Sequence, residues 1–341
     1  MSREGSMSVL RGALGCAVVL ALLVGRGSAQ PNATSNSYVI EEGWQQFLDG
    51  RRLGPATKVA LDRDGKSVWV FDRCGAADCV GSKSDPIAKF DRSGNLLVRF
   101  GGGMFNHPHG LHIDHDGNVW ATDDHGGGGK GLQVFKFSPQ GKVLMTLGKP
   151  GIAGDGPDTF NAPTDVLVAA TGDVFVSDGH GGDTGARIVK FSKDGKFIAA
   201  WGRRGSGPGE FALPHALAMD SAGRLFVADR GNNRIEIFDQ DGKFVAAWKQ
   251  FGRPSGLFID KNDILYCMDS ESTAAVNPGF RRGLTIGSAR DGTVITFIPP
   301  PFIEGQAANA RQWGEAVAVD DDGNIYLGMN GTKGVDRYAV R

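Results

Sequence analysis

The chain has 341 residues, a formal net charge of −1 and 52 glycines, and 40% of its residues are hydrophobic. A charge this close to zero, with no basic surplus, argues against nucleic acid as a partner. Glycine is about twice as frequent as the ~7% that is usual in proteins. With only 15 prolines and no collagen period, this composition favours a protein with many tight turns over a disordered chain, a coiled coil or a helical bundle.

The N-terminus has the features of a secretory signal peptide. Arg3 and Arg11 precede the apolar run GALGCAVVLALLVG (12–25), and the small residues Gly27-Ser28-Ala29 follow it. The run is too short to span a bilayer comfortably. We therefore predict a leader over residues 1–29 and a secreted or periplasmic protein.

Cys74 and Cys79 lie close together in the loop DRCGAADCVG, whereas Cys267 stands alone in an apolar run. An oxidising compartment would allow a Cys74–Cys79 disulfide that stiffens the loop. Cys267 is interpreted as a small buried apolar residue.

An internal repeat is the strongest signal in the sequence. A turn followed by a short apolar run recurs six times, and the first five copies are each followed by a second alternating run with a central glycine. The first element reads SVWVFD (67–72), GNVWATD (117–123), GDVFVSD (172–178), GRLFVAD (223–229), DILYCMD (263–269) and GNIYLG (323–328). Units of about 50 residues with four short strands predict an all-β protein, a six-bladed β-propeller.

The sixth unit ends one strand short of the others. The segment YVIEEGWQQFL (38–48) is predicted to supply the missing outer strand, which closes the ring and covers a free sheet edge. The chain is thus divided into a signal peptide (1–29), an N-terminal segment that includes the closing strand (30–54) and one propeller (55–341).

Six side chains are predicted to lie at equal height at one mouth of the central channel, because the first strand of each blade lines that channel. They are Thr57, His109, Thr164, His215, Ser255 and Glu315. His109, His215 and Glu315 come from alternate blades, so near-threefold symmetry turns them toward one axis. Two imidazoles and a carboxylate suit Zn²⁺ or another divalent metal such as Fe(II). The simpler alternative is that these polar side chains only contact water.

The loops after the second strands open onto the same mouth. Arg73 and Arg230 there would bind an anionic substrate, since a guanidinium pairs with a carboxylate bidentately. His180 is a candidate general acid or base near neutral pH. The aspartates of these loops recur blade after blade and are interpreted as turn-forming residues; the alternative for Arg230 is an ordinary surface residue.

Particular segments resemble known families. DSAGRLFVADRGNNRIEIF (220–238) resembles NHL repeats. HPHGLHIDHDGNVWATD (107–123), APTDVLV (162–168), VFVSDGHGGDTGARIVKFSKDGKFIAAWG (174–202) and LPHALAM (213–219) are similar to peptidyl-α-hydroxyglycine α-amidating lyases. The similarity covers roughly residues 55–341 and implies an NHL-type six-bladed propeller that holds zinc in its channel.

This resemblance implies a ligand set. His109 and His215 match two of the family's three zinc-binding histidines, and Glu315 stands in the place of the third. The family's structural calcium uses an aspartate where this chain has Ala316, which argues against calcium here.

The resemblance also implies an activity. Arg73 and Arg230 match the family's two active-site arginines, and His180 replaces its catalytic tyrosine. We expect a zinc-dependent lyase that cleaves the C–N bond of an N-acyl or peptidyl α-hydroxyglycine-like compound to an amide and a glyoxylate-type carbonyl. The substrate would be small and anionic or peptide-like, a separate monooxygenase would hydroxylate it, and the protein would be a monomer with no membrane partner.

Two other functions remain open from the sequence. The same metal would activate water in a hydrolase such as a lactonase, and ring-opened acid products would indicate that reaction. Alternatively, an NHL propeller can bind a partner without catalysis, which predicts no stoichiometric metal and a large exposed apolar patch.

Overall fold

The structure is a computed structural model that describes residues 1, 38–47, 49–180, 185–299, 314–330 and 334–341. The predicted signal peptide falls, apart from Met1, outside the described residues. In the part of the chain that is described, no helix is long and apolar enough to cross a membrane.

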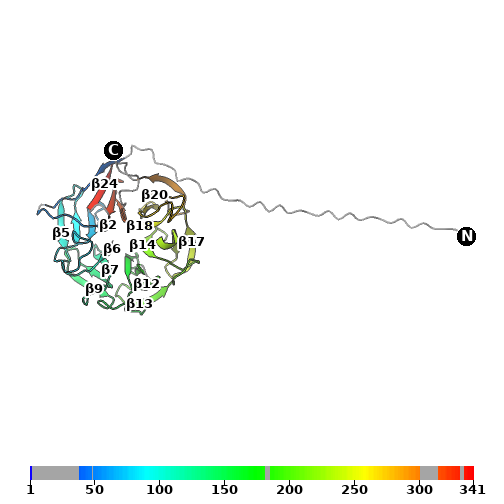
Figure 1. Cartoon of the computed structure of the whole chain (residues 1–341), viewed down its shortest axis with the longest axis horizontal. Coiled ribbons are helices and arrows are strands. Elements are labelled where there is room, and N and C mark those ends of the chain that lie inside the picture. The colour runs from blue at the N-terminus through cyan, green and yellow to red at the C-terminus, as the bar shows by residue number, and fades with distance from the viewer. Residues whose placement is uncertain (2–37, 48, 181–184, 300–313, 331–333) are drawn as a thin grey trace.

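The described residues form six four-stranded sheets arranged around a central axis (Figure 1). Blades one to three consist of β2 (Ala56–Leu61), β3 (Val68–Asp72), β4 (Ile87–Phe90) and β5 (Leu96–Phe100); β6 (Pro108–Ile113), β7 (Val119–Asp123), β8 (Gln133–Phe137) and β9 (Val143–Leu147); and β10 (Pro163–Val168), β11 (Val174–Asp178), β12 (Arg187–Phe191) and β13 (Phe197–Trp201). Blade four consists of β14 (Pro214–Met219), β15 (Leu225–Asp229), the 3₁₀ helix η1 (Arg230–Asn232), β16 (Arg234–Phe238) and β17 (Phe244–Trp248). Blades five and six consist of β18 (Pro254–Ile259), β19 (Ile264–Asp269), β20 (Gly283–Ser288) and β21 (Val294–Ile298), and of β22 (Ala316–Val319), β23 (Ile325–Met329), β24 (Gly334–Val340) and β1 (Tyr38–Glu41).

The predicted six-bladed β-propeller is therefore confirmed. The strands within each blade pair antiparallel, and the first strands of neighbouring blades contact one another around the whole ring, including β2 with β22. The first strands thus line the axis, as the repeat predicts.

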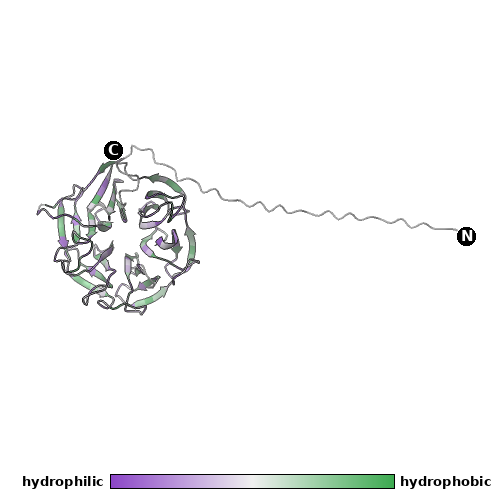
Figure 2. Cartoon of the chain, viewed as in Figure 1, coloured by the Kyte–Doolittle hydropathy of each residue, from purple (hydrophilic) through white to green (hydrophobic). Residues whose placement is uncertain are grey.

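Strand burial follows the apolar pattern of the repeat. The second strands of blades one to four are buried at every residue, whereas outer strands such as β9 and β13 are largely exposed. Hydrophobic residues recur in every part of the ring (Figure 2), because each blade buries its faces against two neighbours.

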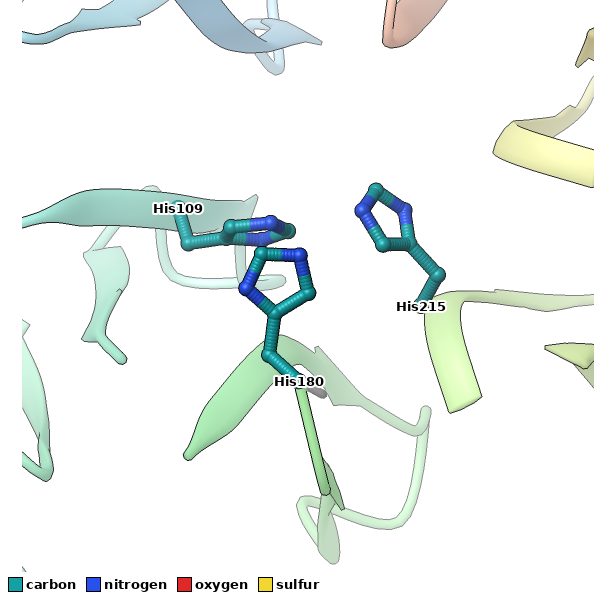
Figure 3. Close-up of side chains that lie close together, drawn as sticks. All are labelled: His109, His180 and His215. Atoms are coloured by element: carbon teal, nitrogen blue, oxygen red, sulfur yellow. The ribbon is translucent and has the colours of Figure 1, made fainter. Parts of the chain in front are cut away.

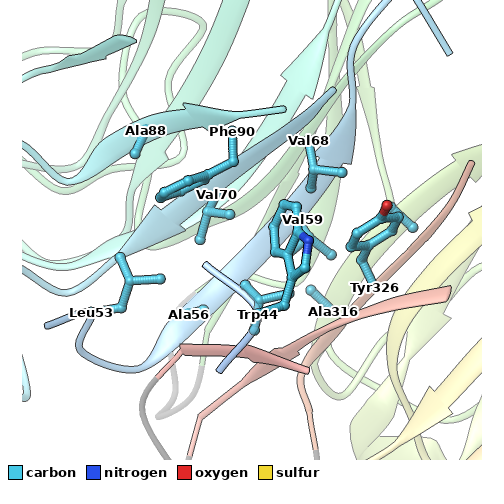
Figure 4. Packing of buried hydrophobic residues seen from close by; sticks show 12 residues of the cluster. Trp44, Leu53, Ala56, Val59, Val68, Val70, Ala88, Phe90, Ala316 and Tyr326 are labelled. Atoms are coloured by element: carbon cyan, nitrogen blue, oxygen red, sulfur yellow. The ribbon is translucent and has the colours of Figure 1, made fainter. Parts of the chain in front are cut away.

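The N-terminal segment closes the ring as predicted, although its strand covers only Tyr38–Glu41 of the expected segment 38–48. β1 pairs antiparallel with β24 at the outer edge of the last blade. Trp44 then packs edge-to-face on Phe90 of blade one and Tyr326 of blade six, with ring centroids 5.8 and 5.0 Å apart (Figure 4). The same segment therefore completes a sheet and fills the seam between the first and last blades.

A repeated aspartate fixes the entrance to blades one to five. The carboxylate at the end of the second strand accepts hydrogen bonds from backbone N–H groups that precede the first strand. The shortest of these bonds joins Asp72 to Gly54 (2.8 Å), Asp123 to Asn106 and His107 (2.7 Å), Asp178 to Ala162 (2.8 Å), Asp229 to Ala212 (2.9 Å) and Asp269 to Arg253 (2.8 Å). The structural interpretation of these aspartates is correct, and each lies one or two residues before a polar residue of the channel mouth.

The cysteines behave as their surroundings suggest. Cys74 and Cys79 form a disulfide in the loop after β3. Cys267 in β19 is a buried free thiol, and burial raises its pKa well above the usual value.

Candidate metal centre and active site

Each candidate channel residue occupies an equivalent backbone position. Thr57, His109, Thr164, His215 and Ser255 are the second residues of the first strands in blades one to five, and the strand pairing shifts register at each of these positions. Such a bulge re-aims a side chain out of the regular alternation. Glu315 immediately precedes β22 in blade six.

His109 and His215 share one hydrogen-bonding arrangement. Nδ1 of His109 lies 2.7 Å from the carbonyl oxygen of Thr164, and Nδ1 of His215 lies 2.6 Å from that of Ser255. Because a carbonyl only accepts, Nδ1 carries the proton and Nε2 carries the lone pair in both rings. Both Nε2 atoms are buried without a hydrogen-bond partner.

Burial keeps these two imidazoles neutral. It lowers the pKa of His109 and of His215 well below the usual value, and neighbouring cationic or imidazole groups lower both further. A neutral imidazole whose Nδ1 donates to a carbonyl and whose Nε2 is free is the usual form of a metal-binding histidine.

His180 completes a group of three imidazoles (Figure 3). One ligand nitrogen from each of His109, His180 and His215 lies within 4.8 Å of the other two. The ring centroids of His109 and His215 are 4.7 Å apart, and that of His180 lies 4.5 Å from His109 and 5.3 Å from His215. His180 therefore stands where a third ligand would stand.

Glu315 is directed to a different neighbour. Its Oε1 lies 3.6 Å from Nη1 of Arg230, and its Oε2 is buried without a partner. Among the described residues, the imidazole group does not include Glu315. The structure thus brings His109, His215 and His180 together and sets Glu315 beside Arg230.

Arg230 links the carboxylate to the imidazoles. It is 6% exposed, and its Nη2 lies 3.4 Å from Nε2 of His180. Burial lowers the pKa of Arg230, while Glu315 and then Glu271 oppose this shift. Its Nε and Nη1 atoms are buried without a hydrogen bond. Arg230 is therefore a channel residue and not a surface one, with donors free for an anion.

Arg73 lies at the same mouth on the loop after β3. Its Nε donates a long hydrogen bond of 3.5 Å to the carbonyl of Pro108, the residue before His109. Burial lowers the pKa of Arg73, and the charges of Glu315 and Asp124 oppose this shift. The second predicted arginine is thus within the electrostatic reach of the candidate site.

Asp124 is the residue that the sequence did not single out. Its Oδ2 lies 2.6 Å from Nδ1 of His180, and its Oδ1 lies 2.5 Å from Nδ1 of His107 and 3.2 Å from Nδ1 of His125. Although burial acts to raise the pKa of Asp124, the imidazoles hold it well below the usual value. A second aspartate directly after the strand-ending Asp123 occurs in none of the other blades, and that irregularity was the available signal.

The residues present fit a divalent metal. Two buried Nε2 lone pairs without partners, a third imidazole within reach and a neighbouring carboxylate form an incomplete polar cluster, which is costly to bury unless something binds there. Three nitrogen ligands with an open position match catalytic zinc.

The fold and this cluster define the class of protein: a six-bladed β-propeller with a histidine-lined channel mouth. Residues 211–238 match the NHL repeat family model, which agrees with the resemblance of 220–238.

The sequence relatives include amidating enzymes. The chain is 37% identical over 239 residues to a rat (Rattus norvegicus) peptidylglycine α-amidating monooxygenase, covering 62% of this chain and 23% of that protein. It is 38% identical over 205 residues to human NHL repeat-containing protein 3, covering 59% and 56%, and 33% identical over 230 residues to peptidyl-α-hydroxyglycine α-amidating lyase 1 of Drosophila melanogaster, covering 59% and 40%. The resemblance to these lyases is confirmed, although the chain spans about a quarter to just over half of the length of these relatives.

Solved structures agree on the fold. A streptogramin B lyase superposes with a TM-score of 0.56 at 13% identity, over 91% of this chain and all of that one. A gluconolactonase from Xanthomonas campestris superposes with a TM-score of 0.56 at 15% identity, over 92% and 97%. At this level of identity the likeness concerns the propeller alone.

Proposed function

We propose that this protein is an exported, metal-dependent lyase that cleaves the C–N bond of an N-acyl or peptidyl α-hydroxyglycine. The observation that carries the proposal is the pair of buried, unpartnered Nε2 atoms of His109 and His215, in a chain whose relatives include amidating lyases. The buried Arg230 beside them supports an anionic substrate.

The ligand set we favour is His109, His215 and His180. Zn²⁺, or another divalent ion, bound there would polarise the substrate hydroxyl and lower its pKa. The geometry exchanges two of the roles expected from the sequence: His180 has the place of the third ligand, and Glu315, with an unpartnered Oε2, has the place of the base. The sequence-based assignment, with Glu315 as ligand and His180 as base, is the alternative. A calcium site is not part of the proposal.

The residues divide the remaining work. Arg230 and Arg73 bind the substrate carboxylate, and Arg230 also holds Glu315 in position by its 3.6 Å ion pair. Glu315 accepts the proton of the substrate hydroxyl. The carbon–oxygen double bond then forms as the C–N bond breaks, and its electron pair passes to the nitrogen, which is protonated. The products are an amide and glyoxylate.

Metal content separates the two ligand assignments. His180→Ala should lower bound zinc per folded protein by at least about 10–100-fold in affinity, whereas Glu315→Gln should retain zinc and lose turnover. If Glu315→Gln loses zinc and His180→Ala keeps it, the sequence-based ligand set is the right one.

The activity is tested by products. Purified protein incubated with a benzoylated α-hydroxyglycine should release benzamide and glyoxylate in equal amounts, and dialysis against a chelator should stop the release until zinc is restored. Hydrolysis of lactones without glyoxylate release would indicate the hydrolase instead. A protein with neither activity nor stoichiometric metal would be a binding module.

Export and the supply of substrate belong to the same proposal. A monomeric lyase acting outside the cytoplasm would receive its substrate from a separate hydroxylating monooxygenase. N-terminal sequencing of the protein recovered from its natural host should find a chain that starts at residue 30; a chain that starts at Met1 or Ser2 would contradict export through this leader.

A further inference from the structure

Asp124 has a second histidine environment on the side away from the three channel imidazoles. His107 and His125 meet its Oδ1, while His180 meets its Oδ2. The rings of His107 and His125 lie edge-to-face with centroids 4.1 Å apart. One carboxylate therefore stands between two histidine clusters.

We propose that His107, Asp124 and His125 form a second binding site for a divalent transition metal. One ligand atom from each residue lies within 4.8 Å of the other two, and imidazole with carboxylate is a donor set that Zn²⁺ accepts. The proposal does not depend on the lyase reaction, because it concerns metal binding by residues outside the channel group.

The backbone around this second site is fixed independently of any ligand. Nδ2 of Asn106 donates to the carbonyl oxygens of His125 (3.2 Å) and Gly127 (2.9 Å), and the N–H of His107 donates to Asp123. Asp124 N–H in turn donates to the carbonyl of His107 at 3.3 Å. Both histidines are thus held in place by main-chain contacts, which reduces the reorganisation needed for binding.

The site is open to solvent on one side. The side chain of His125 is 58% exposed, that of His107 is 14% exposed and that of Asp124 is fully buried. A cavity of about 370 Å³ is lined by Asp124, His125, His180 and neighbouring loop residues. A metal held there would have room for water or a substrate group as its fourth ligand.

The two sites would be coupled through Asp124. Oδ1 would bind the second metal, while Oδ2 would remain on Nδ1 of His180 and fix that ring with Nε2 toward the channel. Replacement of Asp124 by Asn should therefore remove the second metal and weaken the first by about 10–100-fold.

The test counts zinc ions bound by the full chain. Protein freed of metal is dialysed to equilibrium against micromolar ZnCl₂ and then analysed for zinc, with Co²⁺ absorption as a check on coordination by nitrogen. Wild-type protein should bind two equivalents, and His125→Ala one. His215→Ala should also bind one equivalent. His115→Ala, which changes an exposed histidine outside both clusters, should bind two.

The outcomes are distinguishable. A wild type that binds one equivalent, or a His125→Ala variant that still binds two, overturns the second site and leaves the channel site intact. If His215→Ala fails to reduce zinc while His125→Ala removes one equivalent, the channel assignment fails and the second site stands. Should His125→Ala unfold, the milder His125→Asn must show the same loss of one equivalent.

Discussion

Blades two and four differ from blades one, three and five at a single equivalent position. Where the latter carry Thr57, Thr164 and Ser255, each hydroxyl is satisfied inside the protein, as in the 2.6 Å bond from Thr164 Oγ1 to the carbonyl of Pro214. Where blades two and four carry histidine, the backbone satisfies Nδ1 and leaves Nε2 without a partner. The repeat thus fixes where the side chain lies, and the residue alone decides whether the position is finished or reactive.

The hydroxyl residues are also partners of the histidines. The carbonyl groups of Thr164 and Ser255 accept the Nδ1–H bonds of His109 and His215. Each blade therefore sets the tautomer of the preceding one, through a main-chain group that does not depend on the side chain at that position.

The largest expected effect breaks a histidine position. His215→Ala removes one of the two free Nε2 ligands, so we expect zinc binding to be lost and glyoxylate release to fall by at least about 1000-fold, since the metal would supply several kcal/mol of transition-state stabilisation. Zinc analysis and initial rates on folded protein measure both.

Thr57→Val is the matched control for that variant. It changes the equivalent position of blade one and loses only the 3.3 Å bond to the carbonyl of Phe71, so zinc content and turnover should stay within a few-fold of wild type. Equal losses in the two variants would mean that the position acts through packing and not through a ligand.

The next effect concerns the repeated aspartates that hold the loops. Asp229 is fully buried and accepts hydrogen bonds from Ala212 N, Asn232 Nδ2 and Arg234 Nε. Asp229→Ala leaves the buried guanidinium of Arg234 without this partner, so we expect the free energy of unfolding to fall by about 3–5 kcal/mol. Denaturant unfolding measures the loss.

Zinc content again gives the contrast. His109 and His215 lie on β6 and β14, not on the loop that Asp229 pins, so the folded variant should keep its zinc. Asp49→Ala, which removes an exposed partner of Arg99, should leave the melting temperature nearly unchanged. A stable Asp229→Ala protein that lacks zinc would contradict the division between loop-holding and metal-binding residues.

The sequence predicts the repeated part of this molecule well, and the unrepeated part only partly. Period-2 runs and turn residues predict the blades, and equal register predicts that His109 and His215 converge. Register could not show that Glu315 faces Arg230, because the side chain of a glutamate is long enough to choose between two neighbours. It also could not show Asp124, whose partners His107, His125 and His180 come from three different loop positions and meet only in the folded ring.

The smallest effect separates the histidine positions from the hydroxyl positions by pH. Burial lowers the pKa of His109 and His215, so below about pH 6.5 the unfolded chain binds protons that the native protein does not. The stability of the zinc-free protein should therefore fall with falling pH, by up to about 1.4 kcal/mol per pH unit for each histidine. Asp123, whose pKa burial raises to about 6, acts in the opposite direction, so the informative quantity is the difference between variants. Urea unfolding at pH 7, 6 and 5 in the presence of a chelator should give a shallower slope for His109→Gln/His215→Gln than for wild type, and an unchanged slope for Thr57→Val. Parallel slopes for all three proteins would show that the two rings take up protons in the native state, and that their Nε2 atoms are not the free lone pairs on which a metal could bind.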